Sequence, residues 1–205
     1  MATPRRPRTS ARKKPKQARS QETVETILAA AAHVFVREGH ARATTNRIAI
    51  AAGVSIGSLY QYFPSKDAIA VELLRRYRAR ILSLVSERLS AIEEASFEVV
   101  VRALMKSLLR AEGIDPGLHR VLIEQVLRTP ARREVHGFED SLEALLADIF
   151  RRVDSRKKID HDLRAFLVVR VVLAVIHAAI VDRPHVDRDA VADELTRMVV
   201  RYVEP

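Results

Sequence analysis

The sequence predicts an all-α protein of about nine helices, and two observations carry this prediction. Apolar residues make up 48% of the 205 residues, and there are only six glycines, a composition typical of a folded chain with long helices. Apolar side chains recur at helical spacing, and no segment alternates between apolar and polar residues for long. The clearest helical face is formed by Val24, Ile27, Leu28, Ala31, Val34 and Phe35.

Residues 1–19 form a basic arm that we expect to be disordered. The arm carries eight of the cations behind the formal net charge of +9, and it contains no Asp or Glu. Pro4, Pro7 and Pro15 oppose a stable helix, and like charges without apolar residues oppose a core. A polyanion is the natural partner of such an arm. A solubilising tail is the alternative.

Capping residues and stop signals divide the first half of the chain into four helices. We expect helices over residues 20–38, 45–52, 56–63 and 66–91. A hydroxyl residue stands at the start of each one: Ser20, Thr44, Ser55 and Ser65. Gly39 stops the first helix, Gly53 the second, and Pro64 follows the third.

Five further helices are expected in the second half. The fifth follows a cap at Ser96, and the sixth and seventh open at Asp115-Pro116 and Thr129-Pro130. Proline costs no hydrogen bond at the first position of a helix. The expected spans are 97–112, 116–128, 130–154, 161–182 and 187–203, with Pro184 breaking the chain between the last two.

Two short helices joined by Gly53 predict a helix-turn-helix, in which the second short helix reads the major groove of DNA. At 100° per residue, Leu59 and Phe63 share one direction, which must face the core. Gly57 and Gln61 then face outward, and tyrosines stand on both flanks. An exposed helix is weakened by a glycine by about 0.8–1 kcal/mol relative to alanine. Close approach of the backbone to DNA would explain Gly57.

The start of the second helix favours phosphate binding. Thr44, Thr45, Asn46 and Arg47 form its first turn, where free N–H groups and hydroxyl donors suit an anion. Lys66, at the start of the fourth helix, offers a further phosphate contact. Plain structural roles remain open for single residues. Thr44, Ser55 and Ser65 also fit helix caps, and Tyr60 and Tyr62 also fit amphipathic residues that cover the edge of the core. We therefore divide the chain into the arm (1–19), a DNA-binding domain (20–66) and a larger helical domain (67–205).

Residues 19–69 resemble the DNA-binding domain of the tetracycline-repressor (TetR) family. The resemblance is strongest in "TTNRIAIAAGVSIGSLYQYFPSKDAI". It implies phosphate contacts at Thr45, Ser58, Tyr60, Tyr62 and Lys66. It implies approach to bases at Asn46, Arg47, Ile56, Gly57 and Gln61. With Thr44 and Ser55 from the helix starts, these residues form the expected DNA-binding site. Ile56 and Gly57 lie where family members vary most, so the operator sequence does not follow.

The resemblance also implies what such a protein does. Members bind a roughly palindromic operator as homodimers, usually repress a nearby gene, and release DNA when a small organic molecule occupies the C-terminal domain. We therefore expect a ligand-responsive repressor whose partners are double-stranded DNA, an effector and a second copy of itself. Activation of transcription and architectural DNA binding with little sequence preference are the alternatives.

The C-terminal half supplies candidates for a dimer interface and a ligand pocket. The helix 165–181 is apolar on nearly every side, so one face must be buried beyond its own domain. The expected interface is Val168, Val171, Val172, Val175, Ala179, Val191, Leu195, Met198 and Val199. The expected pocket is Tyr77, Leu104, Leu108, His119, Leu122, Phe138, Leu142, Val169 and His177. His177 and Arg170 share one stripe, which is either a cavity border or a solvated edge.

The sequence gives little support to other classes of protein. The sequence has no HExxH metal signature, phosphate loop or nucleophile elbow, so we expect no enzyme, cofactor or metal site. It has no cysteine, which fits a reducing compartment, and we expect a cytoplasmic, nucleoid-associated protein. The segment 165–181 is too short and too polar for a membrane span.

Deleting residues 1–19 tests the role of the arm. If the arm follows the DNA backbone, the variant should bind DNA with a flatter dependence on salt concentration, because fewer counterions are released. The measurement is the slope of log affinity against log salt. A slope equal to that of the full chain would remove the arm from the interface.

Overall fold

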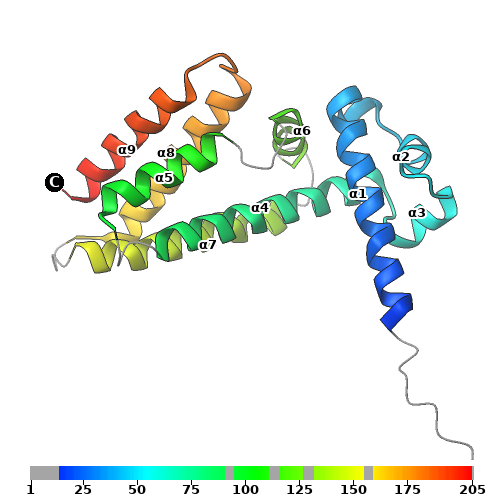
Figure 1. Ribbon diagram of the computed structural model, residues 1–205, viewed down its shortest axis with the longest axis horizontal. Coiled ribbons are helices and arrows are strands. Elements are labelled where there is room, and N and C mark those ends of the chain that lie inside the picture. The colour runs from blue at the N-terminus through cyan, green and yellow to red at the C-terminus, as the bar shows by residue number, and fades with distance from the viewer. Residues whose placement is uncertain (1–13, 91–94, 111–115, 127–131, 155–158, 205) are drawn as a thin grey trace, which may run out of the picture. The chain divides into compact units, whose positions relative to one another are not determined.

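In the computed structural model, residues 14–90, 95–110, 116–126, 132–154 and 159–204 are described, and their regular structure is entirely helical (Figure 1). The all-α prediction is confirmed for these residues. They divide into two compact units, Met1–Ile69 and Ala70–Pro205. The division falls in the first turn of α4 (Lys66–Ser90), three residues after the boundary expected from the sequence.

The N-terminal unit begins with α1 (Lys14–Arg42). The prediction of a disordered arm over 1–19 is wrong for its last six residues, which are the start of this helix. Pro15 lies in the first turn, where a missing N–H breaks no hydrogen bond. Ser20 therefore lies inside α1 and is not its cap. Residues 1–13 of the expected arm lie outside the described residues.

Gly39 interrupts α1 close to its end. Its φ of 74° and ψ of 156° lie outside the helical region, in a conformation that is costly for any residue with a Cβ. The predicted stop at Gly39 is therefore seen in the backbone. One further turn follows, closed by a hydrogen bond from Ala43 N–H to the Gly39 carbonyl.

α2 (Thr45–Ala52) and α3 (Ile56–Tyr62) are joined by the turn predicted at Gly53. Gly53 adopts the left-handed conformation, with φ 66°. Its N–H bonds to Ile50 O at 3.1 Å, and Val54 N–H bonds to Ala49 O at 3.0 Å. This pair of bonds is a Schellman motif, which satisfies carbonyls at the end of α2. The helix-turn-helix prediction is confirmed.

The core of this unit is formed by one side of each helix. The predicted face of α1 is buried through Ile27, Leu28, Ala31, Val34 and Phe35, and Ile48 and Ala49 are the buried residues of α2. α1 packs against α2, and α2 against α3. Caps at Thr44, Ser55 and Ser65 are present as predicted, each side-chain oxygen accepting from a backbone N–H three residues on.

The C-terminal unit contains the rest of α4 and five more described helices. They are α5 (Phe97–Leu109), α6 (Pro116–Val126), α7 (Arg132–Val153), α8 (His161–Val181) and α9 (Arg188–Val203). Each lies within a few residues of its predicted span. Ser96 caps α5, and Pro116 is the first residue of α6. Asp115 and Thr129-Pro130 lie outside the described residues.

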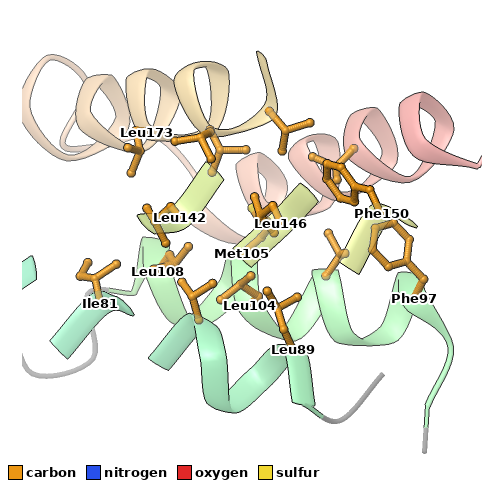
Figure 2. Close-up of a pocket in the computed structure, with 16 residues that line it drawn as sticks. Ile81, Leu89, Phe97, Leu104, Met105, Leu108, Leu142, Leu146, Phe150 and Leu173 are labelled. Carbon is orange, nitrogen blue, oxygen red and sulfur yellow. The ribbon is translucent and has the colours of Figure 1, made fainter. Parts of the chain in front are cut away.

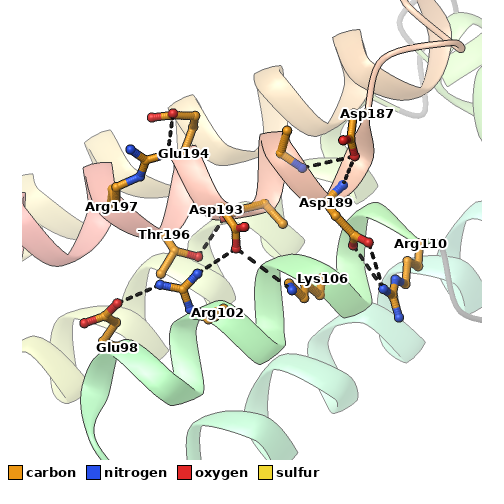
Figure 3. Close-up of polar contacts among 12 residues, drawn as sticks. Glu98, Arg102, Lys106, Arg110, Asp187, Asp189, Asp193, Glu194, Thr196 and Arg197 are labelled. Atoms are coloured by element: carbon orange, nitrogen blue, oxygen red, sulfur yellow. Dashed lines mark hydrogen bonds and ion pairs between the residues drawn. The ribbon is translucent and has the colours of Figure 1, made fainter.

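Salt bridges join α5 to α9 along one side of the core (Figure 3). Arg102 donates to Asp193 at 2.7 Å, and Arg110 to Asp189 at 3.0 Å. Residues on each helix that are four or eight apart lie on one face, so the pairs line up. Because these groups are 37–55% exposed, their net stabilisation is small.

α8 is long and apolar enough, by length and composition, to cross a membrane. It is nevertheless a core helix of this unit, since Ala165, Val169 and Ile176 are buried. Arg170 on the same helix pairs with Glu139 and Glu143 of α7. These ion pairs place its charged side against another helix.

Candidate nucleic-acid interface and apolar cavity

The outer side of α3 and the first turn of α2 form one exposed surface, which we call the reading surface. Leu59 is fully buried and Phe63 is 8% exposed, whereas Tyr60 is 51% exposed. Gly57 and Gln61 are also exposed. The orientation of α3 expected from helical periodicity is therefore the observed one.

A hydrogen bond between side chains links the two helices of the reading surface. Tyr60 Oη and Thr45 Oγ1 lie 3.0 Å apart. Each hydroxyl has one proton and two lone pairs, so whichever group donates, the other keeps its proton for a further acceptor. Thr45 and Tyr60, both expected to contact phosphate, thus present one shared O–H donor at a fixed position.

The capping side chains are already engaged in the protein. Thr44 Oγ1 accepts from Arg47 N–H, and Ser55 Oγ both accepts from Ser58 N–H and donates to Ser58 Oγ at 2.9 Å. The caps leave other N–H groups of the first turns without intrahelical partners, as at any helix start. Thr44 Oγ1 only accepts, so its hydroxyl keeps a proton, and this O–H and the free N–H groups are donors suited to a phosphate.

The reading surface is free of acidic residues. No Asp or Glu occurs between Glu38 and Asp67, and neither α2 nor α3 has an acidic residue in its first turn. Arg47 pairs with Glu38 at the end of α1. Hydrogen bonds from Arg37 and then Arg47 lower the pKa of Glu38, so it remains charged. Arg47 is thus tied to α1 while its side chain stays 58% exposed to solvent.

Lys66 does not offer the free phosphate donor that the sequence suggested. Its Nζ donates to the carbonyls of His40, Ala41 and Ala43 at 2.8, 3.1 and 3.0 Å. An ammonium has three N–H donors, and all three are used on the C-terminal end of α1. The cation also lies where the negative end of the α1 dipole is found. Lys66 therefore ties the start of α4 to the end of α1.

A cavity of about 50 Å³ lies in the core of the C-terminal unit, and its lining is entirely apolar (Figure 2). Four residues of the predicted pocket line it: Leu104, Leu108, Leu142 and Val169. Leu122 is buried but does not line the cavity. Phe138 is likewise absent from the lining, and its ring instead receives the guanidinium of Arg78, 5.1 Å from the ring centroid.

The three polar residues of the predicted pocket form a hydrogen-bonded chain away from the cavity lining. Tyr77 Oη lies 2.6 Å from His119 Nδ1, and His119 Nε2 lies 3.3 Å from His177 Nδ1. They come from α4, α6 and α8. His119 is 6% exposed. Burial, with a smaller effect of His177, lowers its pKa to about 4, so it is neutral at pH 7.

The residues predicted for dimerisation are divided between the core and the surface. Val168, Val172, Ala179, Leu195 and Val199 are buried in the core of their own chain, and Val175 and Val191 are partly buried against it. Of the predicted set, Val171 and Met198 are the most exposed, at 40% and 41%. Helical period could not select the outer face of α8 because nearly every position of that helix is apolar.

The exposed apolar surface of α8 and α9 shares Val171 and Met198 with the predicted interface and adds four residues that the sequence did not reveal. Its exposed side chains are Leu163, Phe166, Leu167, Val171, Met198 and Tyr202. Part of it is a groove of about 260 Å³ lined by Leu167, Val171, Met198 and Tyr202 above Val168 and Val199. We call this set the α8–α9 surface. An exposed apolar patch of this kind marks an interaction site.

Replacing Lys66 by methionine separates the two roles considered for it. We expect Lys66→Met to lower the free energy of unfolding by about 2 kcal/mol, because three carbonyls lose a charged donor. The salt dependence of DNA binding should keep its slope, whereas loss of a phosphate contact would reduce that slope by about one. Chemical unfolding and DNA titrations at several salt concentrations make the test, and a reduced slope would contradict the structural role.

The buried imidazole of His119 predicts loss of stability in acid. The unfolded chain takes up a proton near the ordinary histidine pKa of 6.5, but the folded chain does so only near 4. The contribution of His119 to the free energy of unfolding is therefore complete above about pH 6.5 and falls as the pH drops toward 4. Between pH 7 and pH 5, the free energy of unfolding of His119→Phe should fall by about 1–2 kcal/mol less than that of the wild type. Urea unfolding at both values measures it, with His185→Phe, at an exposed position, as the control.

Comparison with known proteins agrees with the helix-turn-helix geometry. Two relatives of this chain are nucleoid occlusion factors named SlmA. The SlmA of Haemophilus ducreyi is 30% identical over 142 residues, which are 68% of this chain and 68% of that protein. The SlmA of Glaesserella parasuis is 29% identical over 143 residues, 69% of this chain and 64% of that protein.

Solved structures show the same fold at lower identity. A TetR-family regulator from Mesorhizobium loti superposes with a TM-score of 0.73 at 19% identity, covering 90% of this chain and 96% of the other. SmeT, the repressor of the Stenotrophomonas maltophilia multidrug efflux pump SmeDEF, gives 0.69 at 22% identity, covering 89% and 90%. SmeT has also been solved in complex with triclosan.

Both parts of the chain match known families of domains. Residues 27–73 match the bacterial regulatory proteins of the tetR family, and residues 96–202 match the tetracyclin repressor-like C-terminal domain. The second match alone covers more than half of the chain. The chain is therefore a member of the TetR family of DNA-binding transcriptional regulators.

Proposed function

We propose that this regulator is a repressor that binds a palindromic operator as a homodimer and is released by a small organic molecule. The reading surface carries the proposal: a helix with its apolar side buried presents Gly57, Gln61 and a tethered Tyr60 hydroxyl to solvent. A surface without acidic residues suits the major groove and its flanking phosphates. Lys66 is not part of the proposed contact set, since its donors are used within the protein.

The α8–α9 surface supports the homodimer. Its exposed residues include two aromatic rings, Phe166 and Tyr202, each covered on one side by the guanidinium of an arginine at 5.2 or 5.3 Å. Aromatic and arginine side chains of this kind are common anchors of interfaces. Two copies of one surface form an isologous contact with twofold symmetry, and a palindromic operator has the same symmetry.

The cavity of the C-terminal unit supports release by a small molecule. Sixteen apolar side chains enclose it, and such a lining suits an organic ligand. SmeT, which shares the fold, is a repressor and has been solved with triclosan. At about 50 Å³ the cavity is smaller than the roughly 300–1,000 Å³ of typical ligand pockets, so binding must widen it. That widening is the proposed source of release.

Nucleoid occlusion is the second candidate function. The observation that favours it is the identity of 29–30% to the two SlmA proteins. In that case the chain would act from many sites on the nucleoid, and the small cavity would need no occupant. We propose nucleoid association in either case.

Footprinting of the DNA upstream of the protein's own gene separates the candidates. A repressor should protect one or a few palindromic sites and lose that protection when its effector is added. A nucleoid occlusion factor should protect sites scattered over the chromosome, with no loss on addition of small molecules. A footprint without any defined site would contradict both specific functions and favour architectural binding.

Gly57→Ala tests the close approach of α3 to DNA. An added Cβ meets only Ser55 Oγ, at 3.9 Å, so the free protein should become more stable by about 0.8–1 kcal/mol. Affinity for the operator should nevertheless fall, because the methyl group occupies space needed by the duplex. The matched control is Gly137→Ala in α7, where no atom lies within 4 Å of the added Cβ. Equal affinities of the two variants would refute the close approach.

A further inference from the structure

The apolar cavity has two distinct ends. Ile81, Leu108 and Leu173 lie together at one end, and Phe97 and Phe150 lie at the other (Figure 2). Ile81 is on α4 and Leu173 is on α8, so two helices meet at the first end. The ring end is closed by an edge-to-face contact, with the ring centroids 6.3 Å apart.

Polar side chains occupy the next helical turn beyond the first end. Tyr77 stands four residues before Ile81 on α4, and His177 stands four residues after Leu173 on α8. Residues four apart lie on one face of a helix, with Cβ atoms about 5–6 Å from each other. Both helices therefore change from apolar to polar at the same end, and His119 of α6 joins them there by hydrogen bonds.

The chain of hydrogen bonds through these three residues can offer a donor to a ligand whichever way the bonds run. If Tyr77 donates to His119 and His119 to His177, then His177 keeps an N–H to offer. If the bonds run the other way, Tyr77 keeps its O–H. One end of the chain has a donor and the other a lone pair in both cases. A carboxylate or a hydroxyl can pair with such a chain, whereas a quaternary ammonium has nothing to donate or accept.

We propose that the effector is an amphiphile, with a hydrocarbon body in the cavity and one hydroxyl or carboxyl head at Tyr77, His119 and His177. This inference rests on the proposed release by a small molecule and gives that molecule a chemical class. The body is apolar because no polar atom lines the cavity, and a polar group placed there would lose its hydrogen bonds to water. The head lies where the first polar partners occur.

The cavity is too small for an alkyl chain unless the helices that line it move apart. A single water needs about 10–15 Å³ on the same measure, so about 50 Å³ holds only a few heavy atoms. An alkyl body must therefore push apart the helices that line the cavity, among them α4 through Ile81.

The test compares probes on the full-length protein without DNA. Octanoate, octan-1-ol, octyltrimethylammonium and acetate are titrated below their micelle concentrations, and affinity is measured by calorimetry. Octanoate and octanol should bind at least about tenfold more tightly than the ammonium probe, a difference of about 1.4 kcal/mol, and acetate should not bind. Equal binding of the three octyl probes would contradict a head site at Tyr77, His119 and His177. Binding of acetate as tight as that of octanoate would contradict a role of the cavity in binding a hydrocarbon body. If no probe binds, the inference as a whole is overturned.

Three variants and one control locate the site within the chain. Tyr77→Phe, checked for folding by circular dichroism, should reduce the preference for octanoate and octanol over the ammonium probe, and His119→Phe should do the same. Val169→Leu, which adds a methylene to the cavity wall, should weaken all octyl probes about tenfold. Val99→Leu makes the same change on α5 at a side chain that is 58% exposed, and it should bind like the wild type. Unchanged selectivity in both head variants, or unchanged affinity in Val169→Leu, would overturn the assignment.

Footprinting without any probe keeps this inference separate from the proposed function. A defined palindromic footprint with no binding of the probes would contradict the proposed amphiphilic effector and support the proposed repressor. Binding of the probes without a defined footprint would contradict the proposed repressor and support the proposed ligand class.

Discussion

The burial of Leu59 and Phe63 decides which side of α3 meets solvent, and the proposed DNA contacts depend on that orientation. Burying two such side chains contributes about 3–6 kcal/mol, several times what a glycine inside the helix costs. The helix therefore keeps its orientation despite Gly57. The left-handed turn at Gly53 places this short helix against α2. Without that turn, the outward residues would form no single surface.

Hydrogen bonds then hold the reading surface in one arrangement before DNA is bound. Tyr60 is tethered to Thr45, Arg47 is paired with Glu38, and Lys66 closes the end of α1. Groups fixed in this way lose little conformational freedom on binding, which lowers the entropic cost of association. Lys66 shows that the donors of a cation next to a DNA-binding motif can all be used within the protein, since its three donors meet three carbonyls of its own chain.

The C-terminal unit separates apolar from polar chemistry along its length. Its core around Leu104, Leu142 and Val169 has no polar group at the cavity, while Tyr77, His119 and His177 gather one turn away. Each buried polar group needs a hydrogen-bond partner, and these three provide partners for one another. An apolar space beside a polar chain is the arrangement that an amphiphilic ligand matches.

The sequence by itself determined most of the helix bounds, the caps at Thr44, Ser55, Ser65 and Ser96, and the orientation of α3, because these follow from local backbone preferences and from the 3.6-residue period. The spacing of the short helices around Gly53 also indicated the helix-turn-helix, and the resemblance of residues 19–69 to known DNA-binding domains indicated the family. Three outcomes needed the tertiary structure. The first is the start of α1 at Lys14, within a segment whose charge and prolines predicted disorder; proline is tolerated there because it lies in the first turn. The partners of Lys66 are some 25 residues away in the sequence. The outer face of α8 was hidden because its apolar residues lie on all sides, and only packing against α5, α7 and α9 decides which of them remain exposed.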